Sequence, residues 1–263
     1  MKKSQAKSKP RYAKKQTTRP AKFSKPLKKA ILNVIHSTQE TKFVTKEYGP
    51  SAFNGIIASK SEWMYPLPSV YMAGNTILAS NNTRIGDTIQ PTHLRVYATV
   101  SLGLDIVRST DIIVKFFVFS LKAGKSDLAV ASSSTPDAGQ FIDGGGANQS
   151  FDGQLTTLGL PINTKVFTPI HTYQFRLSKG CGYINGGGYT DTYVTGSSTT
   201  FKHWSFDIPL PANLKYGDDA STMPQNFCPV MAVGYVHADG TGPDDAYQDI
   251  RVAYRSNLFF KDS

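Results

Sequence analysis

The sequence has little cysteine and no long hydrophobic run. Its 263 residues include two cysteines, Cys181 and Cys228, without a CxxC pair, which excludes a disulfide framework and a zinc site. The longest apolar stretch, Ile112 to Phe119, is interrupted by Lys115 and is far too short to span a bilayer. The first thirty residues contain no apolar run that would act as a secretory signal. We therefore expect no membrane insertion and no requirement for an oxidising compartment.

Motifs of catalysis are missing as well. The sequence has no G-x-S-x-G, no G-x-x-x-x-G-K-[ST], no H-E-x-x-H and no paired histidines of a nicking enzyme. The five histidines stand on separate segments without the spacing of metal ligands: His36, His93, His171, His203 and His237. We predict that the chain is not an enzyme, binds no metal and uses no cofactor.

Two acidic pairs leave one metal alternative open. Asp218-Asp219 and Asp244-Asp245, with Asp249 nearby, are oxygen ligands of the kind calcium prefers, and such a site would lie between subunits. The alternative, which we favour, is that they are solvated carboxylates of turns that contain Gly217, Gly240 and Gly242.

Acidic residues are absent from the first thirty positions, which hold twelve of the 29 Lys and Arg. The rest of the chain keeps 17 bases against 19 acids, a net charge of −2, although the whole chain has +10. Pro10, Pro20 and Pro26 oppose helix formation and the like charges repel one another. We predict a flexible basic arm over 1–38 and a globular domain over 39–263, with a short helix or the approach to the first strand over 26–37.

The composition of the arm favours binding of single-stranded nucleic acid. Cations follow a phosphate backbone, and aromatic rings such as Tyr12 and Phe23 stack on bases. A solvated charge run or a localisation signal is the alternative, and KPRYAKK is compatible with nuclear import. The predicted nucleic-acid-binding residues are Lys2, Lys3, Lys7, Lys9, Arg11, Tyr12, Lys14, Lys15, Arg19, Lys22, Lys25, Lys28 and Lys29.

From residue 39 onward the hydrophobic period is two, which indicates β-strands. Leu94, Val96 and Val100 alternate with polar residues, and 112–119 is apolar on both faces, as in a strand deep in a sandwich. We predict an all-β domain with eight strands near 39–47, 92–102, 111–121, 163–168, 170–178, 200–209, 228–237 and 248–260. The predicted core is Leu94, Val96, Val100, Ile113, Phe117, Phe175, Trp204, Phe206, Val233 and Ile250.

The connections between these strands are rich in Gly and Ser. Three of them, 49–91, 122–162 and 179–199, are long enough to be surface excursions, and long loops on a rigid scaffold usually make contacts. An antiparallel two-sheet sandwich is the economical interpretation.

Several segments carry a family resemblance. Glu40-Thr41-Lys42, the run Asn82 to Val96 with its R-x-G-D-x-I-x-P entry into a strand, Asn163 to Phe167, and the final Leu258 to Asp262 resemble the capsid proteins of circular, Rep-encoding single-stranded DNA viruses. In the R-x-G-D segment we expect Gly86 to permit a tight turn, Asp87 to accept backbone N–H bonds and Pro91 to extend the chain before the strand.

The resemblance implies a single eight-stranded antiparallel jelly roll in an icosahedral shell of about 60 copies or a multiple. It also implies that the arm contacts a packaged genome, that the protein is found in the virion and, during assembly, in the host nucleus, and that an import receptor and a cell-surface receptor are possible partners. The same fold serves small RNA viruses and satellites, so an RNA genome stays open. Two further alternatives are a non-viral single-strand-binding β protein and a glycan-binding module that uses Trp63, Trp204, Tyr235 and Phe259.

Overall fold

The computed structural model describes residues 24–27, 31, 34, 40–74, 83–103, 111–122, 126, 138–145, 148–178, 183–184, 192–193, 200–243 and 249–262. The chain divides into two units, Met1–Gln39 and Glu40–Ser263. In the first unit, residues 25–27, 31 and 34 are helical, which agrees with the helix alternative predicted for 26–37. The second unit is the β domain.

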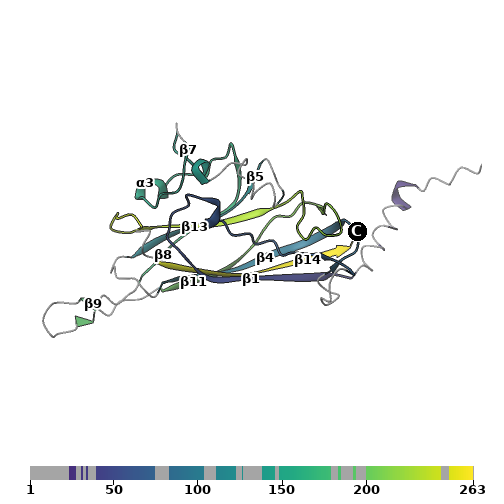
Figure 1. Ribbon diagram of the computed structural model, residues 1–263, viewed down its shortest axis with the longest axis horizontal. Coiled ribbons are helices and arrows are strands. Elements are labelled where there is room, and N and C mark those ends of the chain that lie inside the picture. The colour runs from purple at the N-terminus through teal and green to yellow at the C-terminus, as the bar shows by residue number, and fades with distance from the viewer. Residues whose placement is uncertain are drawn as a thin grey trace, which may run out of the picture. The chain divides into compact units, whose positions relative to one another are not determined.

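Two antiparallel sheets build the β domain (Figure 1). The first sheet runs in the order β1 (Lys42–Phe53), β14 (Ile250–Asp262), β4 (Thr88–Leu102) and β11 (Phe201–Asp207), with the short β12 (Leu214–Lys215) paired to β4. The second sheet has the order β13 (Pro229–His237), β5 (Ile112–Leu121) and β8 (Phe167–Leu177).

The pairing of these strands is nested, as in a long hairpin rolled into two layers. The first strand, β1, pairs with the last, β14; the segment at Met64 forms a bridge with Met231 of β13; β4 pairs with β11 and β5 with β8. This is the jelly-roll order, in which the chain changes sheet at nearly every connection. The prediction of eight strands is corrected, because the described ranges hold seven strands of seven or more residues. The predicted strands 163–168 and 170–178 are the single strand β8, and between β1 and β4 the chain joins the second sheet only through the bridge at Met64.

Short elements complete the description of the fold. β2 (Tyr71–Met72) pairs in parallel with β3 (Thr83–Arg84), β6 (Ile142–Asp143) pairs with β7 (Asn148–Gln149), and β9 (Tyr183–Ile184) pairs with β10 (Thr192–Tyr193). Two short 3-10 helices, η1 (Lys60–Glu62) and η3 (Ala138–Gln140), and one turn of helix, α3 (Leu155–Leu158), lie in the connections. Of the predicted excursion 179–199, only β9 and β10 fall within the described residues.

The main core lies between the two sheets. It joins alternate residues of β4, such as Leu94 and Val96, to Val114 and Phe116 of β5 and to Val233 of β13. Seven of the ten predicted core residues are buried, and Ile113, Phe175 and Trp204 are half-buried instead. Phe175 and Trp204 stand on β8 and β11, which end the two sheet orders, so less of the molecule covers them.

A second core covers the other face of the second sheet. Phe117 and Phe119 of β5 pack there against Phe141 and Phe151 of the long connection, and Trp63 packs edge-on against Phe119 with ring centroids 5.5 Å apart. Figure 1 shows α3 and β7 on this side of the sheet. The described parts of 49–91 and 122–162 are therefore not only surface excursions, because they bury a third layer of apolar residues. This layer explains why β5 is apolar on both faces.

A buried lysine anchors the third layer to the sheet. Lys115, 7% exposed, donates from Nζ to the carbonyl oxygens of Leu158 and Leu160 at 2.5 and 2.9 Å. These carbonyls lie at the end of α3, where backbone acceptors lack helical partners. Burial lowers the pKa of Lys115.

The strands predicted at 163–168 and 170–178 are one strand, β8, and residues 164–166 form a turn. The side chain of Asn163 accepts a hydrogen bond from the Lys165 N–H at 3.0 Å and donates one to the Gln140 carbonyl, which sets the turn. Pro169 does not end β8, because it faces a bulge between Val118 and Phe119 where no donor is required.

Candidate nucleic-acid interface

Most of the predicted nucleic-acid-binding residues lie outside the described part of the chain. Lys25 is the one described member of that set, and it is exposed on helical backbone. The assignment of binding to the arm stays a prediction.

Within the β domain, the outer face of the first sheet brings polar, basic and aromatic side chains together. Register places them in rows that cross the strands: Phe43, Phe259 and His93; Thr45, Asn257, Arg95 and Asp207; Glu47, Arg255, Tyr97 and Ser205; Ala253, Thr99 and His203; and Arg251, Ser101 and Phe201. Because side chains alternate along a strand, every member of these rows points away from the main core. We call this surface the open sheet face.

Ion pairs organise the charges of the open sheet face. Arg95 donates from Nε and Nη2 to the two carboxylate oxygens of Asp207 at 2.8 and 3.0 Å, and His93 Nε2 lies 3.1 Å from Oδ1 of the same group. The hydrogen bond from Arg95 is the main cause that lowers the pKa of Asp207, and it raises the pKa of Arg95 in turn. Arg255 Nε lies 3.7 Å from a carboxylate oxygen of Glu47.

Sequence reasoning missed the role of Arg84 in the R-x-G-D segment. Its guanidinium is fully buried, donates to the carbonyls of Gly86, Asp218 and Ser221, and stands 4.4 Å from the ring centroid of Tyr216. Asp87 Oδ1 is 3.3 Å from Nη1. The motif therefore fastens the entry of β4 to the connection after β12.

The glycine of the same motif behaves as expected. Gly86 has φ +86, the left-handed region that favours glycine. The carbonyl of Asp87 accepts the Tyr216 N–H at 2.8 Å, so its backbone rather than its carboxylate makes the described contact with an N–H.

The acidic residues of the calcium alternative do not form a cluster in the part of the chain that is described. Asp218 Oδ1 accepts hydrogen bonds from the N–H and hydroxyl of Ser221, both at 2.7 Å, which lowers the pKa of Asp218. Asp249 is buried elsewhere, and Asp244-Asp245 lie outside the described residues. No group of three or more potential metal ligands occurs among the described residues.

Asp249 belongs to a buried polar group. Its Oδ2 accepts a hydrogen bond from the Tyr235 hydroxyl at 3.1 Å and stands 3.2 Å from His237 Nε2, and all three side chains are buried. The Asp249 carbonyl accepts the Gly103 N–H at 2.7 Å. The group fastens the beginning of β14 to the end of β13. Of the other described histidines, His93 and His171 both contact Asp207, at its carboxylate (3.1 Å) and its backbone carbonyl (2.9 Å), and His203 contacts the Thr99 hydroxyl at 2.9 Å. His36 is outside the described part.

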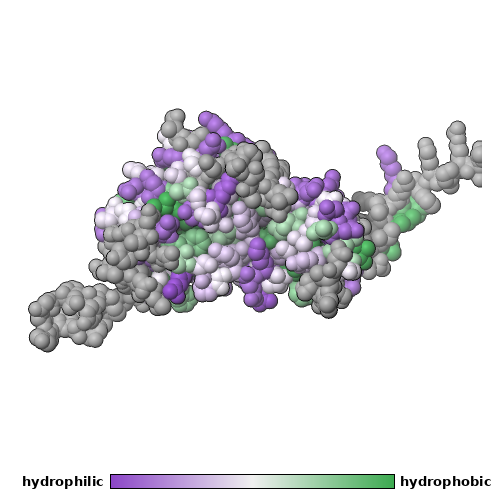
Figure 2. Space-filling model, in the orientation of Figure 1, coloured by the Kyte–Doolittle hydropathy of each residue, from purple (hydrophilic) through white to green (hydrophobic). Residues whose placement is uncertain are grey.

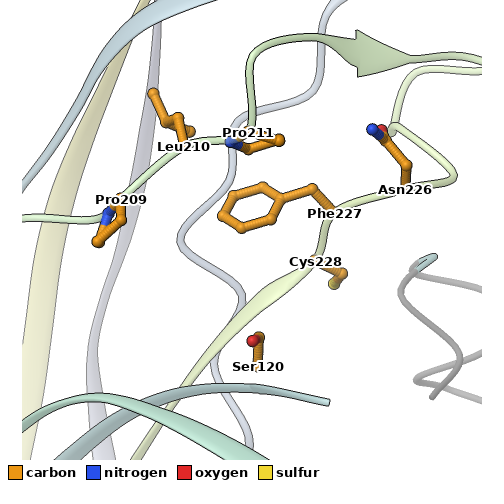
Figure 3. A pocket seen from close by; sticks show the side chains of 7 residues that line it. All are labelled: Ser120, Pro209, Leu210, Pro211, Asn226, Phe227 and Cys228. Carbon is orange, nitrogen blue, oxygen red and sulfur yellow. The ribbon is translucent and has the colours of Figure 1, made fainter. Parts of the chain in front are cut away.

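A surface pocket of about 250 Å³ opens near the start of β13 (Figure 3). The lining residues are Ser120, Pro209, Leu210, Pro211, Asn226, Phe227 and Cys228. The ring of Phe227 is directed toward the Pro209–Pro211 segment, and Cys228 is buried. None of these lining residues is charged, so the pocket has no cation to pair with a phosphate. Cys181 lies outside the described residues.

The four rings of the glycan alternative do not share a surface. Trp63 and Tyr235 are buried, Trp204 packs within the sandwich against Phe116, and only Phe259 stands on the open sheet face. On the side of the molecule visible in Figure 2, hydrophobic and hydrophilic residues are intermixed without one extended apolar area.

Among the described residues no helix has the length and apolar character needed to cross a membrane. No protein-family model matches the chain, and no curated protein matches it.

Two solved structures of virus particles are similar to the chain at low scores. One is Desmodium yellow mottle tymovirus, with 14% identity and a TM-score of 0.32, covering 85% of this chain and 88% of that one. The other is the full particle of Israeli acute paralysis virus heated to 63 degrees, with 9% identity and a TM-score of 0.28, covering 100% of this chain and 82% of that one. Scores this low do not establish a shared fold, so the strand order alone carries the description of the fold.

Proposed function

We propose that the chain is a viral coat protein whose β domain forms a closed shell and whose arm binds a single-stranded genome inside it. The observation that carries the proposal is the separation of charge. Twelve bases and no acid occupy the first thirty residues, whereas the remainder, a two-layer sandwich with jelly-roll strand order, has a net charge of −2. The segments that resemble capsid proteins of circular single-stranded DNA viruses support the same assignment.

Packaging in this proposal is electrostatic and largely independent of sequence. Each phosphate neutralised by Lys or Arg releases condensed counterions, which drives binding. A shell of about 60 copies would bring roughly 700 positive charges in its arms, enough for a genome segment on the order of 700 phosphates.

Assembly in this proposal depends on contacts between β domains. A domain with a net charge near −2 has little repulsion between copies to overcome. The tethered arm adds reach without fixed geometry, since 29 residues extend at most about 100 Å.

The finer parts of the proposal come from the resemblance. They are a circular single-stranded DNA genome, passage through the host nucleus with the help of KPRYAKK, and recognition of a receptor at the cell surface. We place binding at the predicted arm residues and the boundary between arm and shell domain at residue 38.

Negative-stain microscopy of the purified chain with single-stranded DNA tests the proposal. We expect closed shells of uniform diameter that protect the DNA from nuclease. A chain that stays a monomer or dimer at every protein and salt concentration, yet binds DNA, would instead identify a single-strand-binding protein without a shell.

A further inference from the structure

The exposed aromatic rings of the β domain gather on one surface. Among the described residues the exposed aromatic side chains are Phe43, Tyr97 and Phe201, at 46%, 37% and 61% exposure. They belong to β1, β4 and β11, and register places all three on the open sheet face. Exposed aromatic rings leave apolar surface in contact with water. A ligand that covers them therefore gains the free energy of burying that surface.

We propose that the open sheet face is a second nucleic-acid-binding surface, on which bases of a single strand stack against aromatic rings. This inference rests on the proposed function, because the same genome would be held by the arm. It also assigns an orientation, with the β1–β14–β4–β11 sheet turned toward the genome.

The geometry of one row fits this role. Phe43, Phe259 and His93 stand directly opposite one another on the adjacent strands β1, β14 and β4. The ring centroids of Phe43 and Phe259 are 6.1 Å apart with planes at 34°, and those of His93 and Phe259 are 6.1 Å apart at 47°. A row of rings across adjacent strands is a platform for successive bases, because every base has a π-face that stacks without regard to sequence.

The charge of the face is complementary to phosphate. It holds three arginines, Arg95, Arg251 and Arg255, against two acids, Glu47 and Asp207. Each acid lies within 4 Å of an arginine of the same face. The β domain as a whole has more acids than bases, so positive charge is concentrated where the exposed rings are.

Among the described residues, the opposite side of the sandwich is covered, whereas the open sheet face keeps exposed rings. The outer face of the second sheet is buried beneath the second core, with Phe117 and Phe119 fully buried. The arm joins the domain at Glu40, three residues before Phe43, a span of at most about 11 Å. A strand bound by the arm is therefore held at high effective concentration near this row of rings.

The test compares three variants of the full chain in filter binding of a thirty-residue oligothymidylate over a salt series. Phe43→Thr/Phe259→Thr replaces two rings by β-branched residues, which are favourable in strands. Leu155→Thr is the matched control, because Leu155 is equally exposed at 46% and lies on α3, beside the second core. Lys14→Gln/Lys15→Gln removes two charges from the arm and tests the proposed function itself.

We expect the ring variant to lose about tenfold or more in affinity at every salt concentration, with an unchanged slope of log K against log salt, since rings release no counterions. The arm variant should reduce that slope by about 1.4. Equal affinities of the ring variant and the Leu155→Thr control would overturn the inference and leave the arm untouched, whereas an unchanged slope in the arm variant would count against the proposed function.

Ultraviolet crosslinking of the wild-type chain to bromodeoxyuridine-substituted DNA gives a second readout that does not depend on the variants folding. Crosslinked peptides should include residues of β1, β4 or β14, and crosslinks confined to residues 1–39 would overturn the inference. A ring variant that binds DNA normally but no longer assembles would identify the face as a contact between copies of the chain, which also overturns it.

Discussion

At the scale of single residues, two buried cations hold loops in place through hydrogen bonds to backbone carbonyls. The residues Arg84 and Lys115 are 0% and 7% exposed to solvent. Both donate mainly to backbone carbonyls rather than to carboxylates. A buried cation is costly unless most of its donors are satisfied. The carbonyls that accept from Nη1 and Nη2 of Arg84 and from Nζ of Lys115 therefore hold the loops that supply them, while Nε of Arg84 has no partner among the described residues.

Replacing Arg84 should therefore be among the most destabilising single changes. Arg84→Met leaves the carbonyls of Asp218 and Ser221 without their donor and removes the contact with the Tyr216 ring, and we expect a loss of about 3 to 5 kcal/mol in the free energy of unfolding. Urea denaturation of the unassembled subunit measures it. Asp87→Asn is the control, since this exposed partner should contribute less than about 1 kcal/mol. Equal stabilities of the Arg84→Met variant and the wild type would show that the guanidinium is not held as described.

The buried Lys115 predicts a specific pH dependence. Its pKa in the folded state is lowered by burial from the ordinary 10.5, so between these two pKa values the unfolded chain binds more protons than the folded one. Stability from this group must then rise with pH in that interval. Relative to Lys115→Met, the wild type should gain stability in urea denaturation as the pH rises toward 10.5.

A second variant controls for the loss of one charge. Lys122→Met removes an exposed lysine that follows the same strand, and its stability difference from the wild type should not show that rise. Parallel pH profiles for the wild type and Lys115→Met would contradict a buried ammonium group.

At the scale of elements, β5 decides the architecture because both of its faces are buried. One face packs in the main core and the other beneath the connection that carries η3, β6, β7 and α3. Gly234 of the neighbouring β13 belongs to the same contact, since a Cβ there would lie 2.4 Å from the Phe151 ring. The absence of a side chain thus lets an aromatic ring lie directly on the sheet.

This arrangement predicts that a residue of the long connection behaves as a core residue. Phe141→Ala should cost about 3 to 5 kcal/mol, because the fully buried ring contacts Phe117 and Phe119 at centroid distances of 5.0 and 5.1 Å. Trp204→Ala should cost less than Phe141→Ala, since Trp204 is only half-buried. Leu155→Ala, at an exposed position of the same connection, should change stability by no more than about 0.5 kcal/mol. Thermal unfolding of the four chains ranks them, and a Phe141→Ala variant as stable as wild type would remove the third layer from the fold.

At the scale of the whole molecule, the chain separates binding charge from folding information. The arm has no strand period and only scattered apolar residues, whereas the described β strands and both hydrophobic cores fall in 40–262. Folding and genome binding should accordingly respond to different changes.

Removal of residues 2–29 should therefore leave the β spectrum in circular dichroism intact and sharply weaken binding of single strands. If all twelve bases contact phosphate, the slope of log K against log salt for the full chain approaches about −8, and the shortened chain should lose most of it. Filter binding across a salt series measures both quantities. An unchanged slope after the deletion would place the electrostatic binding site on the β domain.

Local patterns determined a large part of this protein in advance. A period of two in hydrophobicity predicted the strands now seen as β4, β11, β13 and β14, because alternation of side chains is a property of the strand itself, and a run that is apolar on both faces predicted β5. The segregated charge of the arm was likewise visible, since charge is additive along a chain. Seven of the ten predicted core residues are buried, because the alternation of side chains places them on covered faces of the strands.

Only the tertiary structure decided what depends on the partner of a residue rather than on the residue. The burial of Phe141 and Phe151 required knowing that their connection folds back over β5, and the anchoring role of Arg84 required carbonyls more than 130 positions away. The row of Phe43, Phe259 and His93 joins three distant segments through register alone. Local sequence specifies the faces of strands, but pairing between distant strands specifies which faces meet, which are covered and which remain open to a ligand.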